Sequence, residues 1–343
     1  MPGSKRALFW KSLRKGRVLC VLCPRYCVIK DGERGYCRAR ENRGGILYSV
    51  VYAKPCSVAV DPIEKKPLFH YRPGSKVLSV ATAGCNLGCL FCQNADIAAG
   101  TVEELPHKEL SPEELVSLAK KYDCEGLAYT YTEPTIFYEY AIDTAKVAKH
   151  EGLFNVFVTN GVISPEPLRK VSKYVDAANI DLKGFTEEYY RKVCDGKLEW
   201  VLDSIKQYNK LGVWVELTNL VVPSQGEFRG NDSVRAVKQM LKWVVDNVGP
   251  EVPFHFSRFF PIHKLSHVSA TRTETLKNFR ELALKAGLKH VYVGNVFDSA
   301  GLNNTVCPEC GRTLLVREGN LVVKNNLVNG RCECGHPVAG VWE

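Results

Sequence analysis

The chain is poor in methionine and in long apolar runs. It has only 2 methionines in 343 residues, and no apolar stretch approaches the roughly 18 residues that a membrane-spanning helix needs. Its first residues also lack the apolar core and small-residue cleavage site of a secretory signal peptide. With 45% hydrophobic and 24% charged residues, the composition is that of a folded protein rather than a disordered one. We therefore expect a cytoplasmic protein without a membrane anchor.

Acidic residues are scarce at the N-terminal end. The whole chain has 46 Lys and Arg against 37 Asp and Glu, but residues 1–74 alone hold 16 basic and 5 acidic residues. Such a basic segment suits an acidic protein partner, an anionic substrate or a merely solvated surface. Nucleic acid is disfavoured, because no recognisable nucleic-acid fold with interleaved aromatic residues accompanies the charge.

Cysteine is abundant and clustered. The chain has 14 cysteines, and in a chain without an export signal such clusters indicate metal or iron–sulfur ligation rather than disulfides. Three sets divide the chain into a basic metal-binding segment (1–74), a core (75–300) and a C-terminal module (301–343). Cys56, Cys124 and Cys194 stand alone, and we expect them to be ordinary core residues.

The core alternates strand and helix patterns. Strands are expected over 77–82, 127–132, 155–159, 177–181, 213–222, 254–256 and 290–293, with helices between them. Ser111 to Glu114 forms a capping box with proline at the first helical position. Repeated βα units predict an α/β fold with a parallel sheet, either doubly wound or barrel-like, and both place functional residues at the carboxyl ends of the strands.

The segment GCNLGCLFCQN places Cys85, Cys89 and Cys92 just after the first predicted strand of the core. Three close thiolates on a glycine-containing loop can bind one iron–sulfur cubane. A cubane has four irons, so three thiolates leave one iron open to an outside ligand, as in a catalytic metal site. The alternative is a zinc knuckle completed by a distant ligand.

This C-x3-C-x2-C spacing, with Phe91 before its last cysteine, resembles the signature of the radical S-adenosylmethionine (SAM) superfamily. The resemblance implies a partial (β/α)6 barrel and a [4Fe–4S] cluster that reductively cleaves SAM to a 5′-deoxyadenosyl radical. YTEP is similar to the segment that holds the SAM amino group, and the Asp-x-Lys of NIDLKGF is similar to that of pyruvate formate-lyase-activating enzymes. Further polar residues end neighbouring strands, and the predicted SAM or substrate contacts are Glu133, Asn160, Asp181, Lys183, His255 and Arg258. No catalytic residue is assigned.

The order of motifs along nearly the whole chain resembles the order found in AmmeMemoRadiSam system radical SAM enzymes. That resemblance implies companion proteins of the same system, and the chemistry implies an electron donor of the ferredoxin or flavodoxin type. The radical would abstract hydrogen from an unidentified substrate or, alternatively, from a glycine of a partner protein. A zinc-based nucleic-acid-binding module is the alternative of another class.

Four cysteines lie on each side of the core. The N-terminal set can hold either zinc or an auxiliary [4Fe–4S] cluster and consists of Cys20, Cys23, Cys27 and Cys37. The C-terminal set flanks a predicted hairpin, LLVREGNLVV, and consists of Cys307, Cys310, Cys332 and Cys334. We interpret it as a structural zinc ribbon, in which the one-residue spacing of the second knuckle leaves His336 as an alternative ligand.

Overall fold

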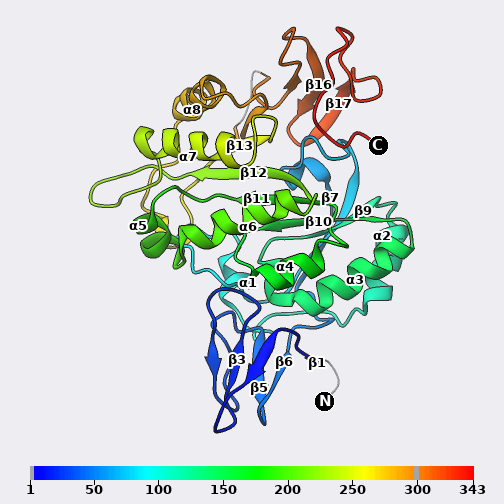
Figure 1. Ribbon diagram of the computed structural model, residues 1–343, viewed down its shortest axis with the longest axis vertical. Helices are drawn as coiled ribbons and strands as arrows, with labels where there is room; N and C mark the ends of the chain where they lie inside the picture. Colours follow the sequence, from blue (N-terminus) through cyan, green and yellow to red (C-terminus); the bar gives the residue numbers. More distant parts are fainter. Residues whose placement is uncertain (1–3, 297–300) are drawn as a thin grey trace.

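The computed structural model describes residues 4–296 and 301–343, and its centre is a twisted sheet (Figure 1). In this part of the chain, eight strands lie in the order β14-β13-β12-β11-β10-β9-β8-β7. They are β7 (Ser57–Pro62), β8 (Lys76–Ala81), β9 (Gly126–Tyr129), β10 (Phe154–Thr159), β11 (Ala177–Asp181), β12 (Trp214–Val221), β13 (Phe254–Arg258) and β14 (Val291–Gly294). Strands β8 to β14 are parallel, whereas β7 pairs antiparallel with β8. The α/β class with a parallel sheet is confirmed.

The strand order follows the chain without a reversal. A doubly wound sheet reverses its order at a switch point, so this topology differs from the doubly wound alternative. The helices that connect the strands are α1 (Ala95–Ala99), α2 (Pro112–Lys121), α3 (Tyr138–His150), α4 (Pro165–Val171), α5 (Glu187–Tyr189), α6 (Leu198–Lys210), α7 (Val234–Asn247) and α8 (Thr273–Lys285). Among the described residues, none of these helices has both the length and the apolarity to span a membrane.

Local sequence signals explain the helix ends. Ser111 accepts a hydrogen bond from the Glu114 amide, and Glu114 accepts one from the Ser111 amide, so the predicted capping box starts α2. Thr186 caps α5, but that helix has only three residues and continues as a π turn to Cys194. The apolar stripe of α8 is buried against β13 and β14. These elements set the carboxyl ends of the parallel strands around one opening.

The N-terminal segment forms two small sheets at one end of the molecule (Figure 1). Their strands are β1 (Lys5–Arg6), β2 (Trp10–Ser12), β3 (Val18–Cys20), β4 (Val28–Ile29), β5 (Arg40–Arg43) and β6 (Ile46–Ser49). Several of its cations bind acidic residues of the core: Lys5 binds Asp143, and Arg34 binds Glu103. Part of the basic excess is therefore neutralised within the chain.

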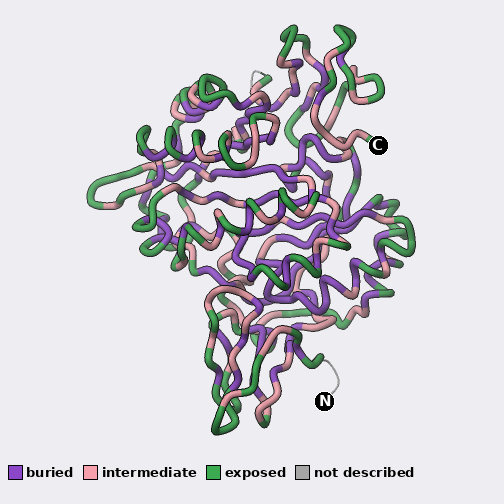
Figure 2. The backbone as a smooth tube through the Cα atoms, viewed as in Figure 1, coloured by how far each residue is buried: buried purple, intermediate pink, exposed green. Residues whose placement is uncertain are grey.

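The C-terminal residues form a third small sheet at the other end (Figure 2 shows both ends as more exposed than the centre). It consists of β15 (Thr305–Val306), β16 (Thr313–Glu318) and β17 (Leu321–Asn325), and the predicted hairpin is the β16–β17 pair. The domain limits stay predictions. The limit at residue 300 lies outside the described residues, and β7, which belongs to the central sheet, precedes the limit at residue 74.

The loop between β7 and β8, residues 63–75, runs into the core, and we call it the inner loop. Its Pro67 carbonyl accepts a hydrogen bond from Asn179 of β11, and the Phe69 and His70 amides donate to the Glu216 carboxylate of β12. The loop therefore fills the space beside the inner faces of these strands and forms one wall of the site described next.

Candidate functional site

A cavity of about 580 Å³ opens at the carboxyl ends of the parallel strands. This volume lies within the range of pockets that hold cofactor-sized ligands. Its lining includes the three central cysteines, residues from the ends of β9 to β13 and three residues of the inner loop. Its polar and sulfur-bearing lining residues include Cys85, Cys89, Cys92, Asn160, Asn179, Asp181, Lys183, Ser257, Lys65 and Lys66.

The loop after β8 brings the three central cysteines to this cavity. Leu87 N–H donates to the Cys85 sulfur and Asn94 N–H to the Cys92 sulfur, an arrangement that stabilises thiolates. The Cys89 thiol contacts that of Cys194, which is buried in the core. Three sulfur donors that face one cavity, with no fourth cysteine among the lining residues described, fit a cubane with one open iron.

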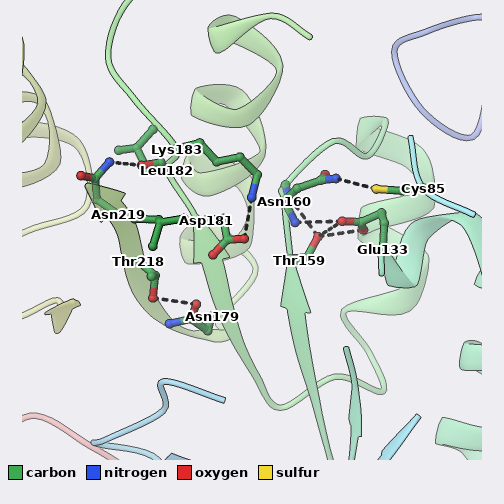
Figure 3. Close-up of polar contacts among 12 residues, drawn as sticks. Cys85, Glu133, Thr159, Asn160, Asn179, Asp181, Leu182, Lys183, Thr218 and Asn219 are labelled. Atoms are coloured by element: carbon green, nitrogen blue, oxygen red, sulfur yellow. Dashed lines mark hydrogen bonds and ion pairs between the residues drawn. The ribbon is translucent and has the colours of Figure 1, made fainter. Parts of the chain in front are cut away.

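Asn160, Asp181 and Lys183 line the same cavity (Figure 3). The Asn160 amide donates to the Cys85 sulfur at 3.7 Å and to the Asn86 side chain at 2.9 Å. Lys183 donates to the Asp181 carboxylate at 2.7 Å. Burial lowers the pKa of Lys183, but Asp181 and the Cys89 sulfur together raise it by more than burial lowers it. The pKa of Lys183 therefore lies well above its ordinary value. Lys183 is thus a fixed cation at the cysteine side of the cavity.

Glu133 lies behind the cavity wall and is fully buried. Its carboxylate accepts hydrogen bonds from the hydroxyl of Thr159 and the amide of Asn160 (Figure 3). It also accepts hydrogen bonds from the amide and hydroxyl of Thr135. Burial raises its pKa against the opposing effect of these bonds. In this structure Glu133 holds the turn that carries Asn160, and it is not among the residues that line the cavity.

Glu133→Gln is therefore expected to lower the free energy of unfolding by about 1–3 kcal/mol, because its amide group meets donors that need an acceptor. Thermal or urea unfolding measures this change. SAM binding should weaken as well, since the Asn160 turn loses its support. The matched control is Glu199→Gln, an exposed carboxylate on α6. Unchanged stability and SAM affinity in Glu133→Gln would contradict this role.

His255 and Arg258 are not among the cavity-lining residues. The His255 ring bonds Glu216 at 2.7 Å and meets the Phe69 ring edge-on, so the inner loop covers it. Arg258 follows Ser257, which does line the cavity, and successive side chains of a strand point to opposite faces. The Arg258 guanidinium instead donates to the Thr271 carbonyl and lies over the Phe260 ring. Their predicted contacts with SAM or substrate have no support in this geometry.

Lys66 of the inner loop is a cavity residue that the sequence did not indicate. Its ammonium donates to the Asp61 carboxylate at 2.8 Å and lies 4.4 Å from the centre of the Tyr131 ring. Burial lowers its pKa to about 8. No periodicity or spacing singles out a lysine in a loop, so only the tertiary structure reveals it.

The C-terminal cysteines form a compact group. Their sulfurs lie within 4.8 Å of one another, with the Cys307–Cys334 and Cys310–Cys332 pairs at 3.7 and 3.6 Å. His336 is not part of this group. A tetrahedral zinc ion with sulfur ligands at about 2.3 Å holds them about 3.8 Å apart, so the four residues fit one zinc ion.

Comparison with known proteins gives four matches. Residues 79–229 match the family model described as the radical SAM superfamily. An uncharacterised protein of Methanocaldococcus jannaschii is 47% identical over 337 residues, covering 97% of this chain and 98% of that protein. The pyruvate formate-lyase-activating enzyme of Clostridium pasteurianum is 25% identical over 176 residues, covering 50% of this chain and 71% of that enzyme. A solved domain of pyruvate-formate lyase-activating enzyme from Bacteroides vulgatus aligns at 16% identity with a TM-score of 0.43, covering 50% of this chain and 99% of that one.

Proposed function

Because residues 79–229 match the radical SAM superfamily model, we propose that the chain is a radical SAM enzyme, which binds a [4Fe–4S] cluster on Cys85, Cys89 and Cys92 and cleaves SAM reductively. The observation that carries this proposal is the shared cavity. The three cysteines line it together with Asn160, Asp181 and Lys183, next to room for a nucleoside-sized ligand.

The cluster, when bound, supplies the electron that breaks a carbon–sulfur bond of SAM and yields a 5′-deoxyadenosyl radical. The three thiolates would hold three irons and leave the fourth for SAM. Asn160 and the Asp181–Lys183 pair offer donors and an acceptor to the polar groups of SAM. Leu87 and Phe91 are buried beside the cysteines and keep water from that wall. The inner loop closes the side opposite the opening, within a sheet that we interpret as a partial (β/α)6 barrel.

The substrate is proposed to be a molecule with an anionic group, because Lys65, Lys66 and Lys183 outnumber Asp181 among the charged lining residues. The alternative is a glycine of a partner protein, which the likeness to pyruvate formate-lyase-activating enzyme favours. The order of motifs supports companion proteins of the AmmeMemoRadiSam system. A ferredoxin- or flavodoxin-type protein would deliver the electron, and the C-terminal group would hold a structural zinc ion.

The test is SAM cleavage by anaerobically reconstituted protein. With SAM and dithionite, we expect 5′-deoxyadenosine and methionine in equal amounts, and neither product when dithionite or SAM is left out. Chromatography with mass detection measures both products. Protein that carries its full iron content and binds SAM but forms no 5′-deoxyadenosine would overturn the proposed function.

A further inference from the structure

The four N-terminal cysteines surround a small cavity of their own. Cys20, Cys23, Cys27 and Cys37 all line it, together with the apolar side chains of Leu22, Ile29 and Ile136. Backbone N–H groups of Leu22, Arg25 and Ala39 each donate to the cysteine sulfur two residues earlier. The central site has the same arrangement at Cys85 and Cys92. The N-terminal cysteines are therefore arranged around a space and supplied with donors to their sulfurs.

Arg40 indicates that the occupant of this cavity is negatively charged. Its side chain lines the cavity and is only 1% exposed. One guanidinium nitrogen, Nη2, donates to the Leu8 carbonyl and the Glu139 carboxylate. Nε and Nη1 are buried and have no hydrogen-bond partner among the described residues. Buried donors without partners are costly, even on a cation that is paired with one carboxylate. The sulfurs of a thiolate-bound metal centre of net negative charge would accept hydrogen bonds from Nε and Nη1.

The spacing of the sulfurs separates two kinds of metal centre. Among residues 4–296 and 301–343, the C-terminal set is the only group of three or more potential ligands within 4.8 Å of one another. Neither the N-terminal set nor the central set is that compact. A single zinc ion draws four sulfurs to about 3.8 Å, whereas a cubane binds each thiolate to a different iron and so holds them farther apart. The central set is the internal reference, because the radical SAM superfamily implies a [4Fe–4S] cluster there.

We propose that Cys20, Cys23, Cys27 and Cys37 bind a second [4Fe–4S] cluster, with Arg40 as its buried counter-ion. Four thiolates leave no iron open, so this cluster carries electrons and binds no substrate. This assignment rests on the geometry of the N-terminal cavity and does not require the proposed SAM cleavage.

The second cluster would lie directly against the first. Gly84, next to Cys85, has φ 98°, and a Cβ atom there would lie 2.2 Å from the Cys37 carbonyl oxygen. Asn86 lines the N-terminal cavity, and its carbonyl accepts a hydrogen bond from Arg25 at 2.6 Å. The backbone of residues 84–86 lies between the two cysteine sets, in contact with Cys37 and Arg25. An outside one-electron donor can therefore reduce the N-terminal cluster to its 1+ state, and its return to 2+ can reduce the central cluster from 2+ to 1+.

Metal and sulfide analysis of reconstituted protein tests the assignment. We expect about eight irons, about eight sulfides and about one zinc per chain in the unaltered protein. The decisive variant replaces Cys85, Cys89 and Cys92 with alanine and leaves the N-terminal segment intact. It should keep about four irons and give the electron paramagnetic resonance signal of a reduced [4Fe–4S] cluster with dithionite. The same variant without iron, or with about two zinc ions, would overturn the proposal.

Two further variants separate this result from the other sites. Cys27→Ser should lose about four irons and keep the zinc, whereas Cys307→Ala with Cys334→Ala should lose the zinc and keep all the iron. If the unaltered protein fails to cleave SAM but the central variant still holds its four irons, the proposed function fails and the second cluster stands.

Electron paramagnetic resonance also tests whether the two proposed clusters lie next to each other. Two reduced clusters in contact through one backbone layer interact magnetically, so the reduced protein should give a broader spectrum than the sum of the two single-cluster variants. In Cys27→Ser, a flavodoxin-type donor should reduce the central cluster more slowly. If the spectrum of the reduced protein equals the sum of the two single-cluster spectra and the reduction rate is unchanged, electron transfer from the N-terminal cluster to the central cluster is overturned.

Discussion

A chain with alanine at Cys85, Cys89 and Cys92 is expected to release no 5′-deoxyadenosine from SAM, even with excess dithionite. The three sulfurs are the proposed iron ligands, and nothing else among the described cavity-lining residues offers a sulfur to replace them. The two flanking cysteine sets occupy separate parts of the chain, so the metals proposed for them should remain. Product analysis under anaerobic conditions measures the loss.

The matched control replaces Cys56 and Cys124 with alanine. These two cysteines belong to neither the cavity nor a flanking set, so the control should keep its SAM cleavage. Undiminished cleavage in the triple variant would contradict the assignment of the cluster to these three residues. Equal loss in the control would point to general damage to the fold.

Arg317→Met is expected to lower the free energy of unfolding by about 3–5 kcal/mol, the usual cost of breaking a buried charged pair. The Arg317 side chain reaches from β16 into the core, where it has no exposed surface and lies 3.8 Å from Glu64. Its Nη2 donates to the Phe69 carbonyl at 2.7 Å, and its guanidinium lies 4.1 Å from the centre of the Phe69 ring. The substitution removes one of the polar contacts between the C-terminal module and the inner loop, alongside those that His70 makes with Ala339 and Val341.

The loss should depend on pH through Glu64. Burial raises the pKa of that carboxyl to about 7, against the opposing effect of Arg317. A raised carboxyl pKa stabilises the fold at low pH, and that contribution fades as pH rises through 7. Without Arg317 the pKa rises further, so Arg317→Met should be more destabilising at pH 8 than at pH 5.5. Unfolding curves at both values measure the difference.

Two variants test this account of Arg317. Adding Glu64→Gln to Arg317→Met removes the unpaired carboxylate and should recover part of the lost stability at pH 8. Arg331→Met, which alters an exposed arginine of the same module, is the matched control. A pH-independent loss, or a loss as large in the control, would contradict the role given to the Arg317–Glu64 pair.

Much of the core could be predicted because its signals are local. Residues 177–181 form β11 with the predicted bounds, and the capping box at Ser111 starts α2. Short runs in which apolar residues dominate or alternate with polar ones predict strands that are buried on a sheet. A capping box predicts two hydrogen bonds within four residues. The ends of the parallel strands then bring Asn160, Asp181 and Lys183 to one cavity, as their positions after successive strands require.

The positions of Glu133, His255 and Lys66 could not be predicted, because a distant segment decides them. The inner loop has no periodic pattern, and its place beside β11 and β12 follows from contacts with Asn179 and Glu216. That placement covers His255 and brings Lys66 to the cavity. Lys5 and Arg6 form β1 because this strand pairs with β6, a contact between residues more than forty positions apart.

The contact between the C-terminal module and the inner loop also sets an order of events during synthesis. Arg317 and Phe69 are 248 positions apart, and Val341 bonds His70 from still farther along the chain. A ribosome releases the inner loop and the central cysteines long before these partners exist, and N-terminal parts of a chain fold first. The inner loop can therefore take its place through Asn179 and Glu216 before the C-terminal module emerges and adds its contacts to Phe69 and His70.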